Sequence, residues 1–206
     1  RHAPAAKHIL FLVLTGLLLV APASGLDLFR DGKAASVILL PPDAHADEQL
    51  AARELTEHLQ QMTGAALSTT SGPAPAGTIP IRIGATLVPE ASARILASSD
   101  DPAAYLLDIT ADGISLAGLT PEGTLFAAYA LLERLGVRWY MPGVLGTVIP
   151  LHHDVTLQPA SDVVSPSFAH RHLQAVSRDL PWYRRMRLGG DYFPGAHGIP
   201  LLPPAD

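Results

Sequence analysis

Two amphipathic segments bordered by short apolar runs limit most strongly how this chain can fold. Residues 43–63 carry leucines at helical spacing and end at Gly64, a residue type that commonly closes helices. Residues 120–135 begin with Thr-Pro-Glu, which supplies an N-cap, a proline at the first helical position and an acid in the first turn. A helix with one apolar face has to bury that face, so we expect both helices to pack on a sheet.

Short apolar runs between Pro, Gly and Asp residues predict the strands of that sheet. The pair Asp112-Gly113 between two apolar runs predicts a hairpin with a type I′ turn, which needs positive φ at both central residues. The element order predicts an α/β fold: a mixed β-sheet with two main helices packed on one face, complete by about Pro159. The expected strands cover residues 35–40, 79–83, 104–110, 114–117, 137–140 and 155–157.

The polar face of the first helix is predicted to be exposed to solvent. It carries Glu48, Arg53, Glu54, Glu57 and Gln61. Charged side chains opposite an apolar stripe usually face water. We therefore expect one side of this helix to stay uncovered.

Composition and charge exclude several classes of function. The 206 residues have a formal net charge of −5, which argues against nucleic acid as a partner because phosphates demand a basic surface. The chain has no cysteine, so disulfides, thiolate zinc sites and a cysteine nucleophile are excluded. No dinucleotide, P-loop, zincin, hydrolase-elbow or calcium-loop motif occurs, and the histidines lack an acidic ligand at matching spacing. We therefore expect no cofactor and no bound metal.

The first 23 residues have the pattern of a secretory signal peptide. Arg1 and Lys7 precede an unbroken apolar run over residues 9–20, and Ala21-Pro-Ala provides a cleavage site. A transmembrane helix needs about 20 apolar residues, more than this run contains. We therefore predict a signal peptide over residues 1–23, a secreted or periplasmic protein, and no membrane association after cleavage.

The character of the sequence changes from Ser165 onward. Five arginines fall within 17 positions, from Arg171 to Arg187. Residues 168–176 are compatible with a strand and residues 181–188 with a short helix. The arginine run is either a solvated helix face or a means of capturing a carboxylate such as that of a uronic acid. About 40 residues cannot bury enough surface to fold alone, so this part is expected to begin a second domain.

Three segments of the chain form a pattern through their order and spacing. They are a helix motif over residues 51–64, AARELTEHLQQMTG, a strand motif over 81–84, IRIG, and a hairpin, helix and strand over 105–140 that contain GTLFAAYALLERLGVRWY. Together they resemble the N-terminal domain of alpha-glucuronidase-like glycoside hydrolases, and the equivalent domain 2 of beta-hexosaminidase-like ones, in an uncharacterised secreted branch. The resemblance covers the whole first domain, residues 35–159.

The resemblance implies both an architecture and a binding residue. In such proteins this α/β domain is an accessory unit that precedes a (β/α)₈ barrel, so residues 165–206 are expected to be the truncated start of a barrel, with 168–176 as its first strand. In related enzymes an arginine near the start of that strand reaches sugar hydroxyls, and Arg171 stands at the matching position. His197, in a Gly-Ala-His-Gly loop, is the second candidate substrate-binding residue. The alternatives are a structural ion pair for Arg171 and a solvent-facing side chain for His197.

Catalysis is not expected from this chain alone. Glycoside hydrolysis normally needs two carboxyl groups that flank the bond, and residues 165–206 hold only Asp179, Asp191 and Asp206, so no catalytic residue is predicted. The leading hypothesis is the accessory N-terminal part of a secreted glycoside hydrolase-like protein that acts on carbohydrate, with the glycosidic bond cleaved elsewhere in the full-length protein. The alternatives are a non-catalytic carbohydrate-binding or structural surface module, and a periplasmic scaffold without a glycan role.

Overall fold

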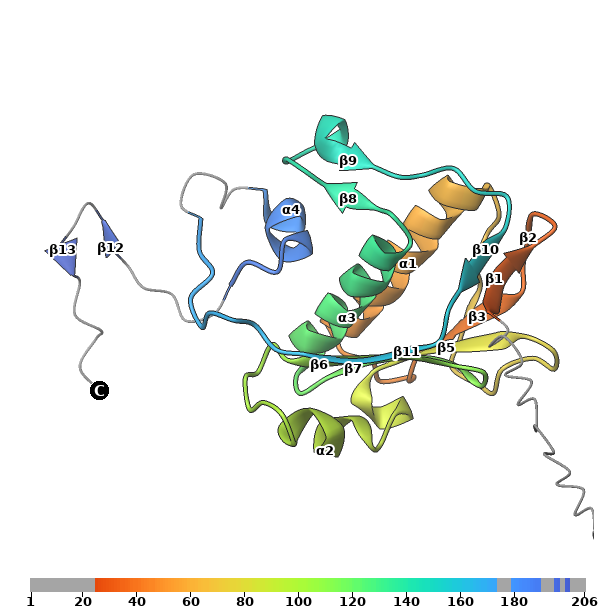
Figure 1. The fold of residues 1–206 in the computed structure, drawn as a ribbon, viewed down its shortest axis with the longest axis horizontal. Coiled ribbons are helices and arrows are strands. Elements are labelled where there is room, and N and C mark those ends of the chain that lie inside the picture. Colours follow the sequence, from red (N-terminus) through yellow and green to blue (C-terminus); the bar gives the residue numbers. More distant parts are fainter. Residues whose placement is uncertain (1–24, 174–178, 190–194, 197–198, 201–206) are drawn as a thin grey trace, which may run out of the picture.

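The fold is built on a six-stranded mixed sheet (Figure 1). The computed structural model describes residues 25–173, 179–189, 195–196 and 199–200, so the predicted signal peptide and His197 lie outside the described residues. The strand order is β11-β6-β7-β5-β3-β4. Parallel pairing joins β7, β5, β3 and β4, whereas β6 is antiparallel to both of its neighbours. The strands are β3 (Ser36–Leu39), β4 (Thr69–Thr70), β5 (Ile79–Ile83), β6 (Tyr105–Thr110), β7 (Gly113–Gly118) and β11 (Ala160–Val164).

Helices cover both faces of this sheet (Figure 1). The two main helices, α1 (Ala46–Thr63) and α3 (Pro121–Arg134), lie side by side on one face, as predicted. The opposite face carries the short helices η1 (Ala85–Leu87) and α2 (Ala91–Leu96), which the sequence analysis did not predict. A separate small apolar cluster lies under α2. It consists of Val88, Ala91, Ile95, Ala104, Leu106 and Ala117.

Both main helices begin at the caps that their sequences provide. The ring of His45 accepts a hydrogen bond from Asp47 N, and the Glu48 side chain accepts one from His45 N, which together form a capping box at the start of α1. Gly64 closes α1 in the left-handed conformation with φ of 77°. The hydroxyl of Thr120 accepts from Gly123 N and caps α3 as expected.

Two of the predicted strands lie outside the main sheet. Strand β10 (Val155–Leu157) pairs with β1 (Leu26–Arg30), which in turn pairs with β2 (Lys33–Ala34) to form a three-stranded sheet. Strand β8 (Arg138–Trp139) pairs only with β9 (Thr147–Val148) across a loop that contains the short helix η2 (Val144–Gly146). Their apolar residues pack against the core without joining its hydrogen-bond ladder, a distinction that periodicity alone does not make.

The predicted hairpin is confirmed, but its predicted turn type is wrong. Thr110 pairs with Gly113, so the central residues of the turn are Ala111 and Asp112, and neither has positive φ. A turn with positive φ at both central residues occurs instead between β1 and β2, at Asp31 (φ 52°) and Gly32 (φ 67°). The Asp-Gly signal is therefore correct for a hairpin at both places and for the type I′ turn at only one.

The C-terminal part of the chain does not confirm the start of a barrel. Within the described part of the predicted strand, residues 168–173, only Arg171 pairs, in a single antiparallel bridge with Gly189. The predicted short helix is present as α4 (Leu180–Arg185). A small two-stranded pair, β12 (Gly195–Ala196) and β13 (Ile199–Pro200), follows. None of the helices in the described ranges is long and apolar enough to span a bilayer.

The glycine at the hairpin supplies a stability test, because Gly113→Ala should cost more than Gly64→Ala. Both residues have positive φ, 127° and 77°. A Cβ on Gly113 would lie 2.4 Å from the Pro80 carbonyl oxygen, whereas a Cβ on Gly64 would meet nothing within 4 Å. We expect Gly64→Ala to lower the free energy of unfolding by about 1 kcal/mol and Gly113→Ala by more than about 2 kcal/mol. Urea denaturation measures both losses, and equal losses would show that the contact with Pro80 adds nothing.

Candidate functional site

The C-terminal segment packs back onto the two main helices. We call residues 179–189, which include α4, the arm. Trp182 is its anchor: the side chain is buried, and its indole Nε1 donates to the main-chain oxygen of Trp139 at 3.1 Å. The indole of Trp139 in turn donates to Nε2 of His58 on α1 at 3.3 Å. A chain of hydrogen bonds therefore joins the arm to the interior of the α/β unit.

A buried ion pair lies beside this chain of hydrogen bonds. The Arg185 guanidinium donates to both carboxylate oxygens of Glu54 on α1, at 3.0 and 3.1 Å. Glu54 is only 5% exposed, so the prediction that it faces solvent is wrong. The prediction failed because the covering surface comes from residues far away in the sequence, and helical periodicity carries no information about them. A bidentate pair of this kind is strong and fixes the relative orientation of its partners.

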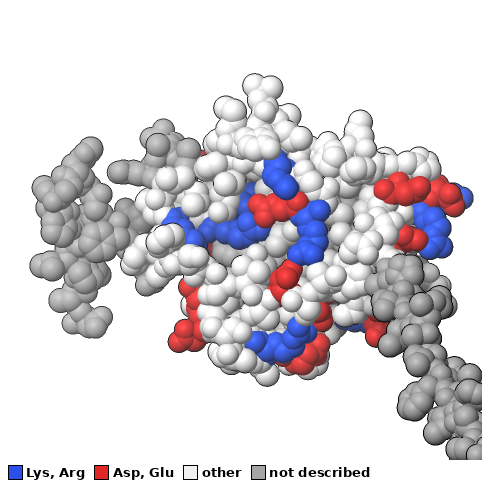
Figure 2. Space-filling model, in the orientation of Figure 1, with Lys and Arg blue, Asp and Glu red and all other residues white. Residues whose placement is uncertain are grey.

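Two further arginines of the arm are paired with acids of the α/β unit. Arg184 lies 3.3 Å from Asp47, and Arg187 lies 2.6 Å from Glu133. Figure 2 shows basic and acidic side chains gathered next to one another on this face. For Arg184, Arg185 and Arg187 the interpretation as a solvated helix face is therefore wrong. Because these three arginines already hold carboxylates of this chain, they no longer support the expectation of a uronic acid ligand.

The environment of His58 favours the neutral form of its ring. Its Nδ1 lies 2.8 Å from the main-chain oxygen of Glu54, which makes Nδ1 the donor, while Nε2 accepts from Trp139. Burial lowers the pKa of His58, and the nearby Arg185 lowers it further, against the opposing effect of the Glu54 carbonyl and carboxylate. Protonation of Nε2 would also break the hydrogen bond from the Trp139 indole.

Arg171, the first predicted sugar-binding residue, lies at the edge of a cavity between the arm and the α/β unit. Its Nε donates to Arg187 O at 2.9 Å and its Nη1 to Phe168 O at 2.7 Å, so two of its nitrogens hold the main chain. We call this space, about 480 Å³ in volume, the seam cavity. Its lining consists of Asp101, Pro102, Ala103, Glu122, Ala169, Arg171, Leu180, Tyr183, Arg184, Leu188 and Gly189.

Glu122 lines this cavity, although the sequence alone indicated for it only the role of a first-turn acid. It occupies the first turn of α3, where an acid is explained by the helix dipole alone. Partial burial raises the pKa of its carboxyl, and so does the negative charge of Asp47, whereas Arg171 and Arg184 oppose the shift. The signal that could have identified it is tertiary, because Arg171 and Arg184, which are distant in sequence from Glu122, lie next to this helix end.

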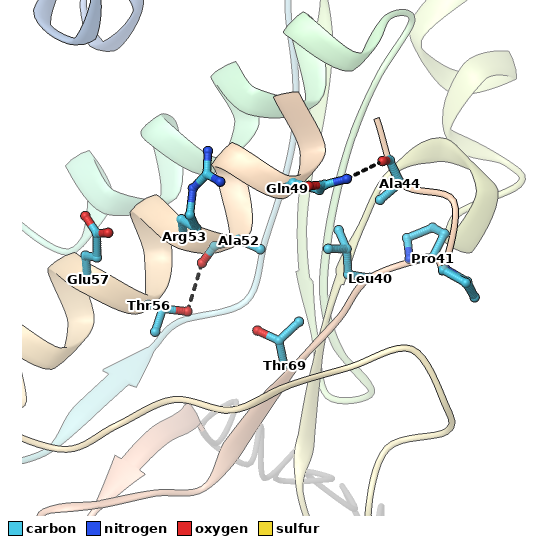
Figure 3. Close-up of a pocket in the computed structure, with 10 residues that line it drawn as sticks. Leu40, Pro41, Ala44, Gln49, Ala52, Arg53, Thr56, Glu57 and Thr69 are labelled. Carbon is cyan, nitrogen blue, oxygen red and sulfur yellow. Dashed lines mark hydrogen bonds between the residues drawn. The ribbon is translucent and has the colours of Figure 1, made fainter. Parts of the chain in front are cut away.

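A second open groove of about 490 Å³ lies beside α1, at the ends of β3 and β4 (Figure 3). Two of its polar side chains are engaged within the chain: Gln49 donates to Ala44 O at 2.9 Å, and Thr56 donates to Ala52 O at 2.8 Å. Arg53, Glu57 and Thr69 complete the polar lining, and the apolar part consists of Leu40, Pro41, Pro42, Ala44 and Ala52. Two charged side chains line this groove, compared with four in the seam cavity. Among the described residues no group of three or more His, Asp or Glu could hold a metal ion.

Comparisons with known proteins support the fold and leave the family open. No family model matches the sequence, and no curated protein matches it. Among solved structures, the chain resembles a family GH115 4-O-methyl-alpha-glucuronidase, BtGH115A, described as having specificity for decorated arabinogalactans. The match has a TM-score of 0.55 and 19% sequence identity, and covers 72% of this chain and 19% of that chain. The chain thus shares an α/β fold with part of that enzyme and spans about a fifth of its length.

Removing Arg185 should destabilise the protein far more than removing Arg184. Arg185→Met leaves the Glu54 carboxylate buried without its partner, and we expect a loss of about 3 kcal/mol in the free energy of unfolding. Arg184→Met is the matched control, because its ion pair with Asp47 is more exposed and should cost less than about 1 kcal/mol. Urea denaturation followed by tryptophan fluorescence measures the free energy of unfolding of both variants. Equal losses in the two variants would contradict the importance of the buried pair.

The lowered pKa of His58 predicts how stability depends on pH. Between the lowered folded value and the unfolded value of about 6.5, the unfolded chain binds more protons. The contribution of His58 is therefore complete above about pH 6.5 and is lost as the pH falls below it. We expect the loss of stability between about pH 7.5 and 5.5 to be smaller in His58→Gln than in the unmodified protein, as measured by urea denaturation at both pH values. Parallel pH profiles would contradict this assignment.

Proposed function

We propose that this chain is the N-terminal accessory module of a secreted glycoside hydrolase-like protein that acts on carbohydrate. The observation that carries the proposal is the likeness of its α/β fold to part of the alpha-glucuronidase, of which it spans about a fifth. An α/β unit of this size, joined to a larger enzyme, is suited to positioning a neighbouring domain. Export rests on the apolar N-terminal segment of the sequence.

The arm suggests how such a module would work. Three ion pairs and the buried Trp182 hold residues 179–189 against α1 and α3. The bidentate contact of Arg185 with Glu54 fixes the orientation of the arm relative to α1. The chain that continues from the arm therefore leaves the α/β unit in a defined direction. A following domain would then start from a defined position relative to the module, which is the general benefit of a rigid connection.

In this proposal no cleavage of glycosidic bonds is assigned to the arm. Cleavage needs two carboxyl groups on either side of the bond. In the described part of 165–206 the only such group is Asp179, and its carboxylate accepts from Trp182 N at 2.9 Å as the cap of α4. Asp191 and Asp206 lie outside the described residues. A non-catalytic carbohydrate-binding module is the second candidate function, favoured by the polar seam cavity.

Incubation of the chain with polysaccharides tests this proposal. We expect retardation in gels that contain arabinogalactan or glucuronoxylan, and no release of reducing sugar from either polymer. Bovine serum albumin run in the same gels is the control for non-specific retardation. Release of sugar would overturn the assignment as a non-catalytic module. An absence of retardation by every polysaccharide tested would overturn the carbohydrate role and favour a scaffold.

A further inference from the structure

We propose that the seam cavity binds one ring of an uncharged sugar, and that docking of the arm completes this site. The inference rests on the proposed carbohydrate role and names the ligand class and the residues that would hold it. The cavity volume of about 480 Å³ falls in the range of about 300–1,000 Å³ that is usual for ligand pockets.

The lining of the cavity combines the two surfaces that a sugar ring presents. Carboxylate oxygens of Glu122 and Asp101 can accept hydrogen bonds from hydroxyls, and the Arg171 guanidinium can donate to ring or hydroxyl oxygens. The apolar side chains of Leu180 and Leu188 and the ring of Tyr183 can cover the C–H face of the ring. A purely apolar ligand would leave these charged groups unpaired, at a cost in free energy.

The charges around the cavity favour a neutral ligand over a uronate. The lining holds two carboxylates and two guanidiniums, and one of the latter, Arg184, is already paired with Asp47 outside the lining. A uronate would bring a third carboxylate next to Glu122 and Asp101, and Arg171 could offer it only the donors that its bonds to Arg187 O and Phe168 O leave free. Uncharged hydroxyls meet no such repulsion.

Both sides of the cavity are needed for the site. The α/β unit contributes the turn at residues 101–103 and Glu122, while the arm contributes Tyr183, Arg184 and Leu188. A ligand that contacts both sides binds only when the arm is docked, so binding and docking must stabilise each other by the same free energy. Arg185 and Glu54 hold the arm but do not line the cavity, which makes them positioning residues.

Calorimetric titration of the intact chain tests the site. The probes are the methyl glycosides of galactose, glucose and arabinose, with glucuronic acid as the charged comparison. We expect at least one neutral glycoside to bind more tightly than glucuronic acid. We expect Glu122→Ala to weaken the binding of that glycoside about tenfold, or by about 1.4 kcal/mol. Glu90→Ala is the matched control: Glu90 precedes α2 on the opposite face of the sheet and makes no capping hydrogen bond, so affinity should not change.

A second variant tests the coupling to the arm. Arg185→Met should weaken binding of the same glycoside although Arg185 does not line the cavity. At one glycoside concentration, the melting temperature of the unmodified chain should rise more than that of Glu122→Ala. Tighter binding of glucuronic acid than of every neutral glycoside would overturn the proposal of an uncharged ligand. Sugar binding that neither Glu122→Ala nor Arg185→Met alters would overturn the cavity and leave the proposed function standing, whereas no binding of any glycoside or polysaccharide would overturn both.

Discussion

The bidentate contact between Arg185 and Glu54 is the interaction on which the docking of the arm, residues 179–189, depends. Glu54 lies on α1 and is buried under the arm, and a buried carboxylate is tolerated only when it is paired and hydrogen-bonded. The partner, Arg185, lies more than a hundred residues after Glu54 in the sequence and belongs to the same arm as Trp182. An ion pair of this kind is often no more stabilising than a well-packed apolar pair, but a misplaced arm would leave the Glu54 carboxylate buried without a partner.

The same docking explains why a cavity exists at the start of α3. Gly123 lets this helix begin close to β6, since a Cβ there would lie 2.7 Å from Ala104 O. The close approach places Glu122 at the edge of the α/β unit, facing the arm across the seam cavity. Arg171 holds the opposite edge together through its bonds to Phe168 O and Arg187 O. Its role in the main-chain structure and its position in the cavity are compatible, because one guanidinium carries several donors.

Sequence reasoning was sufficient for the local structure and for the approximate fold. It predicted α1 with its closing Gly64, α3 with its N-cap Thr120, the hairpin of β6 and β7, and a mixed sheet with both main helices on one face. It did not predict the cap of α1 at His45. It missed α2, whose six residues are too short for a clear helical period, and it placed the type I′ turn at the wrong Asp-Gly pair. The strand expected over residues 168–176 reduces, in its described part, to the bridge of Arg171 with Gly189.

The candidate site shows where sequence information ends. Caps, apolar stripes and turn residues act over a few positions, so the sequence by itself determined where helices and strands begin, which faces are apolar, and that the chain has no cysteine chemistry. Only the tertiary structure decided that Glu54 is buried, that Arg184, Arg185 and Arg187 are paired, and that Glu122 shares a cavity with Arg171. The physical reason is that charge pairing depends on distance in space, and a pattern of neighbouring residues does not specify which distant segment will cover a helix face.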